Sequence, residues 1–545
     1  MGGDAEGFRP TRHLEIAMRY LELIEKTALE RPDAEAVRVS TGAHLTYGEL
    51  WASSEALALA IARRVEPGSP VLVYGNKDPL MVAGFLACMK AGCPYVPVDC
   101  FSVPAERVAS IARQIAGGCS APLVLAVEEF PHVDDMPPVE VLTHEDLCRI
   151  VGAGFREGSR RSGWILGEDI AYILFTSGST GDPKGVEVTA ACFDNFCAWD
   201  VELSRRGGEA PCGVDGASPA DVWVDQAPFS FDLSVFELAG ALATGGTLFS
   251  LAHETQQSMA SQMEALAASG ATVWVSTPSF AGMCLASAEF AQDLMPALRL
   301  FLFCGETLPN AVAARLLERF GRARVVNTYG PTESTVAVSA VDVTPRMAAS
   351  REPLPVGAPR RGTRLRIVDA EGRDCAAGVF GEVVIEGDTV ARGYYHRPDL
   401  TAAAFGAAEL GGAPVRSYRT GDEGCLDGEG MLHFRGRLDL QVKLNGFRIE
   451  LGEIEEHIRR LPDVAAVAVV AEQRDGRVAH LVAHVVPAGP LAQTPFRAGL
   501  ALKERLRRTL PHYMIPKKIA FCEALPLTGN GKVDRRALVG VPAKA

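Results

Sequence analysis

A loop rich in glycine and hydroxyl side chains follows the apolar run 172–175, which is typical of a buried strand. Glycines let successive backbone N–H groups converge on one anion, the hydroxyl groups add donors, and Lys184 adds a positive charge. Because Lys184 is followed by Gly185, the loop departs from the P-loop signature, which has Ser or Thr after the lysine. We predict a phosphate site; a solvated Gly/Ser turn is the alternative interpretation. The candidate residues are Thr176, Ser177, Gly178, Ser179, Thr180, Gly181 and Lys184.

A second candidate is a carboxylate between aromatic residues. Apolar and polar residues alternate over 229–235, which predicts a strand with Phe229 and Phe231 on one face and Asp232 on the other. Such a carboxylate could bind an ammonium group inside a largely apolar pocket. The alternative interpretation is that Asp232 caps a helix that begins near Val235.

Three further strand-like runs end in polar or glycine-rich turns. In an open parallel sheet, ligands collect at the carboxyl ends of the strands, so we expect these turns and the phosphate loop to line one crevice. Within it, Tyr329 offers a flat face for a base, and Thr332 and Glu333 offer oxygens suited to Mg²⁺. Read alone, these residues are equally a turn with a helix cap. The three runs are 273–278, 300–306 and 325–336.

The C-terminal third has a different sequence pattern. From about residue 353, short strand-like runs are separated by Gly/Asp turns, which predicts a β-rich subdomain. Asp422 lies in one such turn and could accept hydrogen bonds from a ribose diol, although a plain turn aspartate is the commoner case. Lys532 lies in a glycine-flanked loop near the end of the chain, where an isolated lysine is usually only solvated.

Strand and helix patterns alternate through the first part of the chain, which argues for a parallel α/β sheet. An amphipathic helix is predicted over 14–30, and a helix that ends at Gly92 precedes a strand bounded by prolines. Segment 205–221 lacks periodicity and predicts a surface loop. The other predicted elements are strands at 36–39 and 71–74 and helices at 47–64 and 79–91.

Composition narrows the class of protein. Hydrophobic residues make up 48% and charged residues 22% of the 545, which is typical of a globular chain. The net charge of -13 disfavours binding to nucleic acid or to an anionic membrane surface. The 13 cysteines form no CxxC pair, and no apolar run reaches the length of about 18 residues that a membrane span needs. We therefore expect a cytoplasmic protein without membrane insertion.

Taken together, these motifs resemble the adenylate-forming superfamily, in particular the amino-acid adenylation domains of peptide synthetases and their free-standing relatives. The resemblance covers nearly the whole chain in family order. Three segments most resemble the D-alanine:D-alanyl carrier protein ligases, namely 226–235, 276–285 and 302–306. The superfamily motifs lie at 45–50, 89–99, 172–188, 327–333, 418–422, 436–443 and 528–532.

This resemblance implies an α/β fold with two domains. Residues 1–438 would form a large N-terminal adenylation core of parallel-sheet α/β layers, with a β-rich subdomain from about residue 353. Residues 439–545 would form a small mobile α+β domain that carries the catalytic Lys532, with Asp439 as the hinge between two arrangements.

The resemblance also implies two half-reactions with ATP and Mg²⁺. The amino-acid carboxylate first attacks the α-phosphorus, which gives an aminoacyl adenylate and pyrophosphate, and a phosphopantetheine thiol on a carrier protein then takes the acyl group. Thr332, Glu333 and Lys532 would be catalytic, with Glu333 holding Mg²⁺ and Lys532 bridging the substrate carboxylate and the α-phosphate. Besides the phosphate loop and Lys532, the implied ATP-binding residues are Asn327, Thr328, Tyr329, Gly330, Pro331, Thr332, Asp422, Phe434, Arg435, Gly436 and Arg437.

Substrate choice would rest on Asp232, as partner of an α-ammonium group, and on a wall formed by Cys284 and Val336. A small pocket fits D-alanine, although L-alanine, glycine and serine stay open because one methyl group changes binding by only about 1–3 kcal/mol. No carrier domain is evident in the 13 residues after Lys532, so the carrier protein is expected to act in trans. Alternatives are a small-amino-acid ligase for a natural-product carrier, an acyl-CoA synthetase, and a non-enzymatic adenylate sensor.

Overall fold

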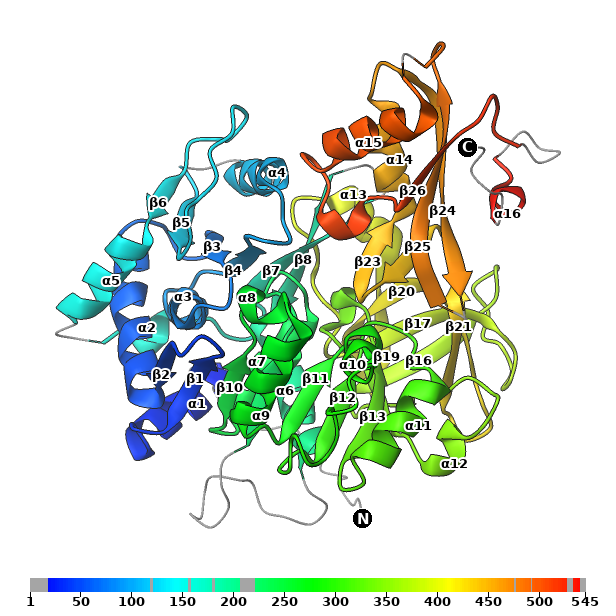
Figure 1. The fold of residues 1–545 in the computed structure, drawn as a ribbon. Coiled ribbons are helices and arrows are strands. Elements are labelled where there is room, and N and C mark those ends of the chain that lie inside the picture. Colours follow the sequence, from blue (N-terminus) through cyan, green and yellow to red (C-terminus); the bar gives the residue numbers. More distant parts are fainter. Residues whose placement is uncertain are drawn as a thin grey trace, which may run out of the picture.

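The computed structural model describes residues 18–117, 121–154, 158–178, 182–205, 221–474, 477–491, 493–526 and 533–539, without the side chains of residues 477 and 536. Two large sheets with helices on their faces make up most of the molecule, and a smaller C-terminal part, yellow to red in Figure 1, lies at one end of them. None of the helices in these ranges is both long and apolar enough to cross a bilayer. The predicted α/β class with a separate C-terminal part is confirmed.

The first sheet has nine strands, and six neighbouring strands at its centre are parallel. The carboxyl ends of these strands carry three of the turns predicted to line a crevice. In spatial order the strands are β15 (Ala358–Pro359), β14 (Ser339–Asp342), β13 (Arg324–Tyr329), β12 (Leu300–Phe303), β11 (Val273–Ser276), β9 (Val222–Asp225), β10 (Thr247–Ser250), β1 (Glu35–Val39) and β2 (His44–Thr46).

The second sheet has seven strands and carries the phosphate loop. Its strands β7 and β8 are antiparallel, with Thr176 opposite Lys184, so the loop connects the two strands of a hairpin. The single crevice predicted from one parallel sheet is thus built by two sheets. In spatial order the strands are β18 (Gly393–Tyr394), β8 (Lys184–Thr189), β7 (Ile170–Thr176), β4 (Tyr95–Asp99), β3 (Val71–Gly75), β5 (Leu123–Ala126) and β6 (Glu140–Leu142).

The largest hydrophobic core lies between the two sheets, and five helices contribute several buried residues each to it. Tyr172 and Leu174 of β7 point into this core, whereas Ile173 packs with α4 (Ala105–Ala116) on the outer face of the second sheet. The outer face of the first sheet is covered by α9 (Met259–Ser269), α10 (Pro278–Cys284) and α11 (Asn310–Arg319). The core helices are α1 (Arg19–Glu30), α2 (Tyr47–Ala62), α3 (Pro79–Lys90), α6 (Ala190–Ser204) and α7 (Leu233–Ala243).

Local signals explain where several helices begin and end. Thr46 and Glu49 form a capping box at the start of α2, and Asp78 caps α3, which has proline in its first turn. Gly92 follows α3 with φ +73, as the sequence predicted for a helix end. The shorter helices of the N-terminal part are α5 (His144–Ala153), α8 (His253–Gln256), α12 (Pro345–Ala348), and the 3₁₀ turns η1 (Arg161–Gly163) and η2 (Thr332–Ser334).

A β-rich subdomain follows, as predicted. Its five strands are antiparallel and pack around their own core together with Tyr329. Its elements are β16 (Thr363–Val368), β17 (Gly381–Gly387), α13 (Pro398–Ala404), β19 (Phe405–Leu410), β20 (Ala413–Leu426) and β21 (Leu432–Arg437).

The C-terminal part begins with a hairpin, β22 (Gln441–Leu444) and β23 (Phe447–Glu450). Hydrophobic clusters on both faces of its three-stranded sheet give this part a core of its own, and the boundary at 438/439 stays a prediction. The other elements are α14 (Leu451–Arg459), β24 (Val464–Arg474), β25 (Arg477–Pro487), α15 (Pro495–Leu506), η3 (His512–Met514), β26 (Lys518–Phe521) and α16 (Arg535–Leu538).

Two predicted elements differ from the structure. The stretch 229–235 is a turn that runs into α7 at Leu233, because Leu233 and Phe236, three residues apart, both enter the inter-sheet core at helical spacing. The predicted lead helix begins at Arg19, and its first residues, 14–17, lie outside the described ranges, as do residues 206–220 of the predicted surface loop.

Candidate functional site

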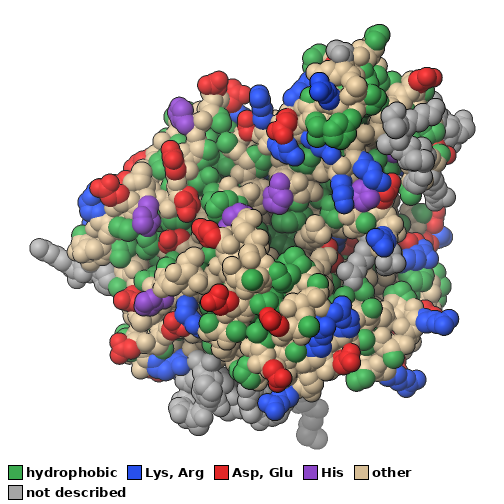
Figure 2. Space-filling view, in the orientation of Figure 1, with side chains coloured by type: hydrophobic (Ala, Val, Ile, Leu, Met, Phe, Trp, Pro, Cys, Tyr) green, Lys and Arg blue, Asp and Glu red, His purple; other side chains and the backbone are tan. Residues whose placement is uncertain are grey.

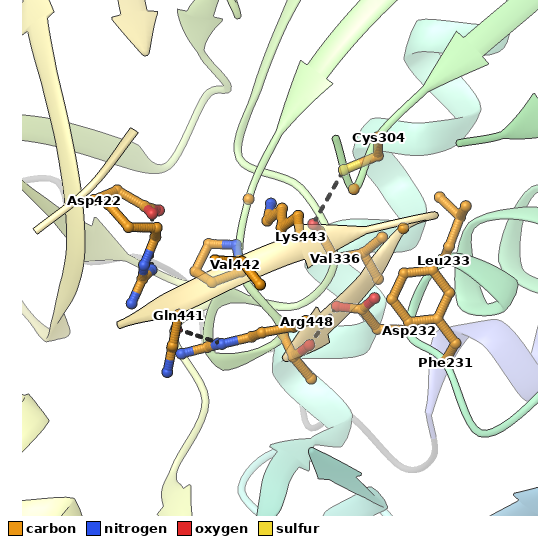
Figure 3. Close-up of a pocket in the computed structure, with 16 residues that line it drawn as sticks. Phe231, Asp232, Leu233, Cys304, Val336, Asp422, Gln441, Val442, Lys443 and Arg448 are labelled. Carbon is orange, nitrogen blue, oxygen red and sulfur yellow. Dashed lines mark hydrogen bonds and ion pairs between the residues drawn. The ribbon is translucent and has the colours of Figure 1, made fainter. Parts of the chain in front are cut away.

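A small pocket lies where the C-terminal hairpin meets the carboxyl ends of the first sheet (Figure 3). Its walls come from the start of α7, from the end of β12, from the turns after β13, and from the β22–β23 hairpin. Most of its lining residues are thus far apart in the sequence. The hairpin completes the pocket, because Lys443 and Arg448 form part of its lining. The hairpin is held there by the N–H of Gly446, which donates to Glu306 Oε1 at 2.8 Å beyond the end of β12.

Asp232 lies on the pocket wall at the residue before α7, and its side chain turns toward the pocket (Figure 3). Its Oδ2 accepts a hydrogen bond from the Thr332 hydroxyl at 2.6 Å. Burial raises the pKa of Asp232 to about 6, although Thr332 and the nearby cations Lys443 and Arg448 oppose the shift. At neutral pH the carboxylate is therefore largely ionised, in a site where an ammonium group would be a favourable partner.

The structure separates Cys284 from this pocket. Cys284 ends α10 on the outer face of the first sheet, where it is fully buried and accepts a hydrogen bond from Gln262 Nε2 at 3.0 Å. Cys304, which directly follows β12, lines the pocket instead, and its Sγ lies 3.7 Å from the Val336 carbonyl oxygen. The wall predicted for Cys284 and Val336 is formed by Cys304 and Val336.

Val336 reaches the pocket from a strained turn. Thr335 and Val336 have φ of +57 and +67, a left-handed conformation that costs a β-branched residue about 1–3 kcal/mol. The Thr335 hydroxyl donates to the Thr389 carbonyl at 2.8 Å, which ties the turn to the neighbouring loop. Such strain held at a ligand pocket is typical of a functional constraint.

A polar clamp lies at the other end of the pocket. Asp422 is 2% exposed, and its two oxygens accept hydrogen bonds from the Tyr329 hydroxyl at 2.6 Å and the Arg437 guanidinium at 2.7 Å. The same guanidinium donates to Asp439 Oδ1 at 3.0 Å. The rings of Tyr329 and Phe434 lie 6.0 Å apart. A carboxylate beside two aromatic faces suits a nucleoside.

The other residues predicted to contact ATP do not all lie in the pocket. Arg435 is exposed, forms an ion pair with Glu423, and lies over the Phe380 ring, so its geometry does not favour the ATP contact. The side chains of Asn327 and Thr328 donate to backbone carbonyls at 2.8 Å and thereby hold the end of β13. Gly330 and Pro331 line the pocket, while Gly436 is paired with Glu423 beside it.

Glu333 is fully buried next to three polar side chains. Its Oε2 accepts from Arg448 at 2.6 Å, and its Oε1 accepts from the Tyr394 hydroxyl at 2.7 Å and lies 3.5 Å from Lys184 Nζ. Burial works against the charged form, but Arg448 and Lys184 outweigh it and hold the pKa of Glu333 well below its usual range. The described residues contain no cluster of three metal-ligating side chains. One carboxylate fits Mg²⁺ that arrives with a polyphosphate, since such ions keep few protein ligands.

The start of the phosphate loop also contacts the C-terminal part. The Ser177 hydroxyl donates to the Arg448 carbonyl at 2.8 Å, and the N–H of Gly178 donates to Glu453 Oε2 at 3.1 Å. The Thr176 hydroxyl donates to the Lys184 carbonyl at 3.4 Å. Ser179, Thr180, Gly181 and Lys532 lie outside the described residues.

Two cations of the pocket, Lys443 and Arg448, come from the C-terminal hairpin and were not among the predicted site residues. The sequence on both sides of the turn alternates polar and apolar side chains, which is typical of a hairpin. It does not show which face of that hairpin meets the N-terminal part, because this depends on how the two parts are placed. Near Lys532, the partly buried Leu525 and Val533 pack against the face of the C-terminal sheet that carries α16.

A cleft of about 650 Å³ lies beside the hairpin, between the two parts of the chain. Phe231, Thr277 and Met283 line it from the N-terminal part, and Phe447 and His512 line it from the C-terminal part. Figure 2 shows a hollow with hydrophobic side chains near the centre of the displayed face. The aromatic ring of Phe447 lies 5.7 Å from that of Phe231, close to Asp232.

Comparisons with known proteins agree with this geometry. Residues 24–395 match the family model described as AMP-binding enzyme, and residues 453–532 match the AMP-binding enzyme C-terminal domain. A Bacillus licheniformis protein named D-alanine–D-alanyl carrier protein ligase is 40% identical over 96% of this chain and 99% of its own length. A Bacillus cereus protein of the same name is also 40% identical, with the same coverage. The structure of an NRPS protein with adenylation and PCP domains, bound to a vinylsulfonamide inhibitor, matches with a TM-score of 0.78 and 29% identity over 95% of this chain and 83% of that one.

Proposed function

Because the chain belongs to the AMP-binding enzyme family, we propose that it is a ligase that activates D-alanine with ATP and loads it onto a separate carrier protein. The near full-length relatives with this name support the assignment. One structural observation carries it: the Asp232 carboxylate lies in a small pocket beside Cys304 and Val336. An amino acid brings an ammonium group to that carboxylate, whereas a fatty or aryl acid brings none.

In the first half-reaction, Asp232 would orient the amino acid through its ammonium group, with Cys304 and Val336 around the methyl group. Asp422 would accept hydrogen bonds from the ribose hydroxyls, with Arg437 and Tyr329 fixing its position. The substrate carboxylate then attacks the α-phosphorus, and pyrophosphate leaves. Catalysis of this step consists mainly of positioning and charge neutralisation.

Several groups would neutralise charge in this step. Mg²⁺, held through Glu333 once Arg448 has moved away, would neutralise the phosphate oxygens. Thr332, which already hydrogen-bonds Asp232, would bring the amino-acid and nucleotide subsites together. The phosphate chain would contact the two ends of the loop, Ser177 and Gly178 at one end and Lys184 at the other. We propose that Ser179, Thr180 and Gly181 between them belong to the same phosphate site. Lys532 is proposed to stabilise charge between the substrate carboxylate and the α-phosphate.

In the second half-reaction, a phosphopantetheine thiol of the carrier protein would attack the aminoacyl carbonyl, and AMP would leave. The cleft beside Phe231 and Phe447 offers such an arm an entry between the two parts of the chain. We propose that the docked hairpin belongs to this step and that Asp439 is the hinge for the change. An ATP-consuming reaction of this kind would take place in the cytoplasm.

The test is ATP/pyrophosphate exchange with D-alanine, L-alanine, glycine, serine and a fatty acid, followed by loading of a purified holo carrier protein. We expect exchange to be fastest with D-alanine and the radiolabelled D-alanine to appear on the carrier protein as a hydroxylamine-sensitive thioester. Exchange with the fatty acid alone would favour the acyl-CoA synthetase alternative. Nucleotide binding without exchange by any of these acids would favour a sensor and contradict the proposal.

A further inference from the structure

Two side chains of the C-terminal part take up the polar groups expected to hold magnesium and phosphate. The Arg448 guanidinium contacts the Glu333 carboxylate at 2.6 Å, and the Glu453 carboxylate contacts the N–H of Gly178 at 3.1 Å. A cation thus lies on the proposed metal ligand, and an anion lies on a phosphate-loop donor. Magnesium pyrophosphate would bring the same charges to these groups, a cation to Glu333 and an anion to the N–H of Gly178.

Glu453 has a second partner in the N-terminal part, Arg107 of α4. The Arg107 guanidinium donates to Glu453 Oε1 at 2.5 Å, while Gly178 donates to Oε2 of the same carboxylate. Arg107 is 7% exposed and Glu453 is fully buried. Because one small anion satisfies both donors at once, Arg107 and Gly178 converge on a single oxyanion position.

Withdrawal of the hairpin would leave Arg107 without this carboxylate. Both donors, the Arg107 guanidinium and the N–H of Gly178, would then be free for another anion in the arrangement used for adenylation. Phosphate suits this position, because arginine binds phosphate oxygens as it binds carboxylate oxygens.

We propose, on the basis of the proposed function, that Arg107 is a pyrophosphate-binding residue of the first half-reaction. In the second half-reaction, the Glu453 carboxylate takes the place of pyrophosphate and the Arg448 guanidinium takes the place of its metal ion. Magnesium pyrophosphate and the docked C-terminal segment therefore compete for Arg107, Gly178 and Glu333, and hairpin docking follows pyrophosphate release.

The two partners of the ion pair make the proposal testable, because their removal has opposite effects. Binding of magnesium pyrophosphate to the full chain is measured by isothermal titration calorimetry without amino acid. Glu453→Gln weakens the internal competitor, so we expect tighter binding than in the wild type. Arg107→Gln removes a ligand contact, so we expect binding weaker by about 10- to 100-fold, the range for one charge-assisted hydrogen bond.

Arg149→Gln on α5 (His144–Ala153) is the matched control, because it makes the same change in an exposed ion pair, with the Arg149 side chain 66% exposed. If Arg107 serves only to dock the two parts, Arg107→Gln will tighten binding as Glu453→Gln does, and the inference is wrong. Should Arg107→Gln fail to fold by circular dichroism, Arg107→Lys keeps the charge, and unchanged or tighter binding by that variant contradicts the inference equally. Wild-type protein that catalyses no exchange and binds no magnesium pyrophosphate would contradict the proposed function itself.

Discussion

Replacement of Gly446 by alanine should separate the two half-reactions. Gly446 lies in the turn of the β22–β23 hairpin with φ +85, and an added Cβ would lie 2.3 Å from Thr277 Cγ2. A left-handed alanine costs about 1–2 kcal/mol and overpacking about 1–3 kcal/mol. The backbone cost applies to the hairpin in either arrangement, so the docked arrangement should lose only the overpacking cost of about 1–3 kcal/mol relative to the undocked one, which lowers the docking equilibrium constant about 5- to 150-fold.

Only the step that uses the docked hairpin should respond. We expect Gly446→Ala to reduce thioester formation from preformed D-alanyl adenylate by that factor and to leave ATP/pyrophosphate exchange close to the wild-type rate. Single-turnover transfer of radiolabelled D-alanine to the carrier protein and steady-state exchange measure the two steps separately.

Gly430→Ala is the matched control. Gly430 has φ +80, but within the described part of the chain no atom lies within 4 Å of an added Cβ. The control therefore contains the backbone cost without the collision at Thr277. Equal loss of both half-reactions in Gly446→Ala, or unchanged transfer, would refute the assignment of the docked hairpin to thioester formation.

Three further predictions concern the substrate pocket and the core. Since the ionised form of Asp232 binds the ammonium group and its pKa is about 6, the KM for D-alanine in exchange assays should rise about tenfold per pH unit below that value, and Asp232→Asn should have a high KM without this dependence. Val336→Ala enlarges the pocket, so relative kcat/KM for D-2-aminobutyrate over D-alanine should rise about 10- to 200-fold, and an unchanged ratio would place the side-chain subsite elsewhere. Lys90 is 1% exposed and pairs with Glu55 at 2.8 Å, so Glu55→Ala should lower the free energy of unfolding in urea by about 3–5 kcal/mol, and a loss below about 1 kcal/mol would show that the pair is dispensable.

Local patterns in the sequence predicted the elements that depend on local chemistry. Gly92 marks the end of α3 because its left-handed φ suits glycine, and the apolar run before Thr176 is a buried strand. Asp232 lies in a pocket with apolar neighbours, as the sequence led us to expect, although its predicted strand is a turn and a helix, and its role in substrate binding stays a prediction. Alternation over seven residues could not distinguish these, since Leu233 and Phe236 also continue a helical pattern through the inter-sheet core.

The remaining differences arise from tertiary placement. Cys284 and Cys304 both follow buried strands, but Cys304 comes immediately after β12, whereas a helix separates Cys284 from β11 and carries it to the outer face of the sheet. Proximity to the carboxyl end of a strand would have favoured Cys304. Lys443, Arg448 and Glu453 enter the site only because the C-terminal part lies against the N-terminal part, which no local pattern specifies.

The Arg437 guanidinium joins two carboxylates with different proposed tasks, Asp422 at the ribose and Asp439 at the hinge. The Arg437 side chain is mostly buried, so a movement of the planar guanidinium toward one carboxylate changes its hydrogen bonds to the other. The proposed ribose-binding carboxylate and the proposed hinge carboxylate thus share one side chain as partner. If Asp422 and Asp439 have these proposed tasks, a ribose that draws Asp422 toward its hydroxyl groups would change the support of the Asp439 carboxylate through Arg437 alone, and the hinge would respond to AMP departure without a longer chain of contacts.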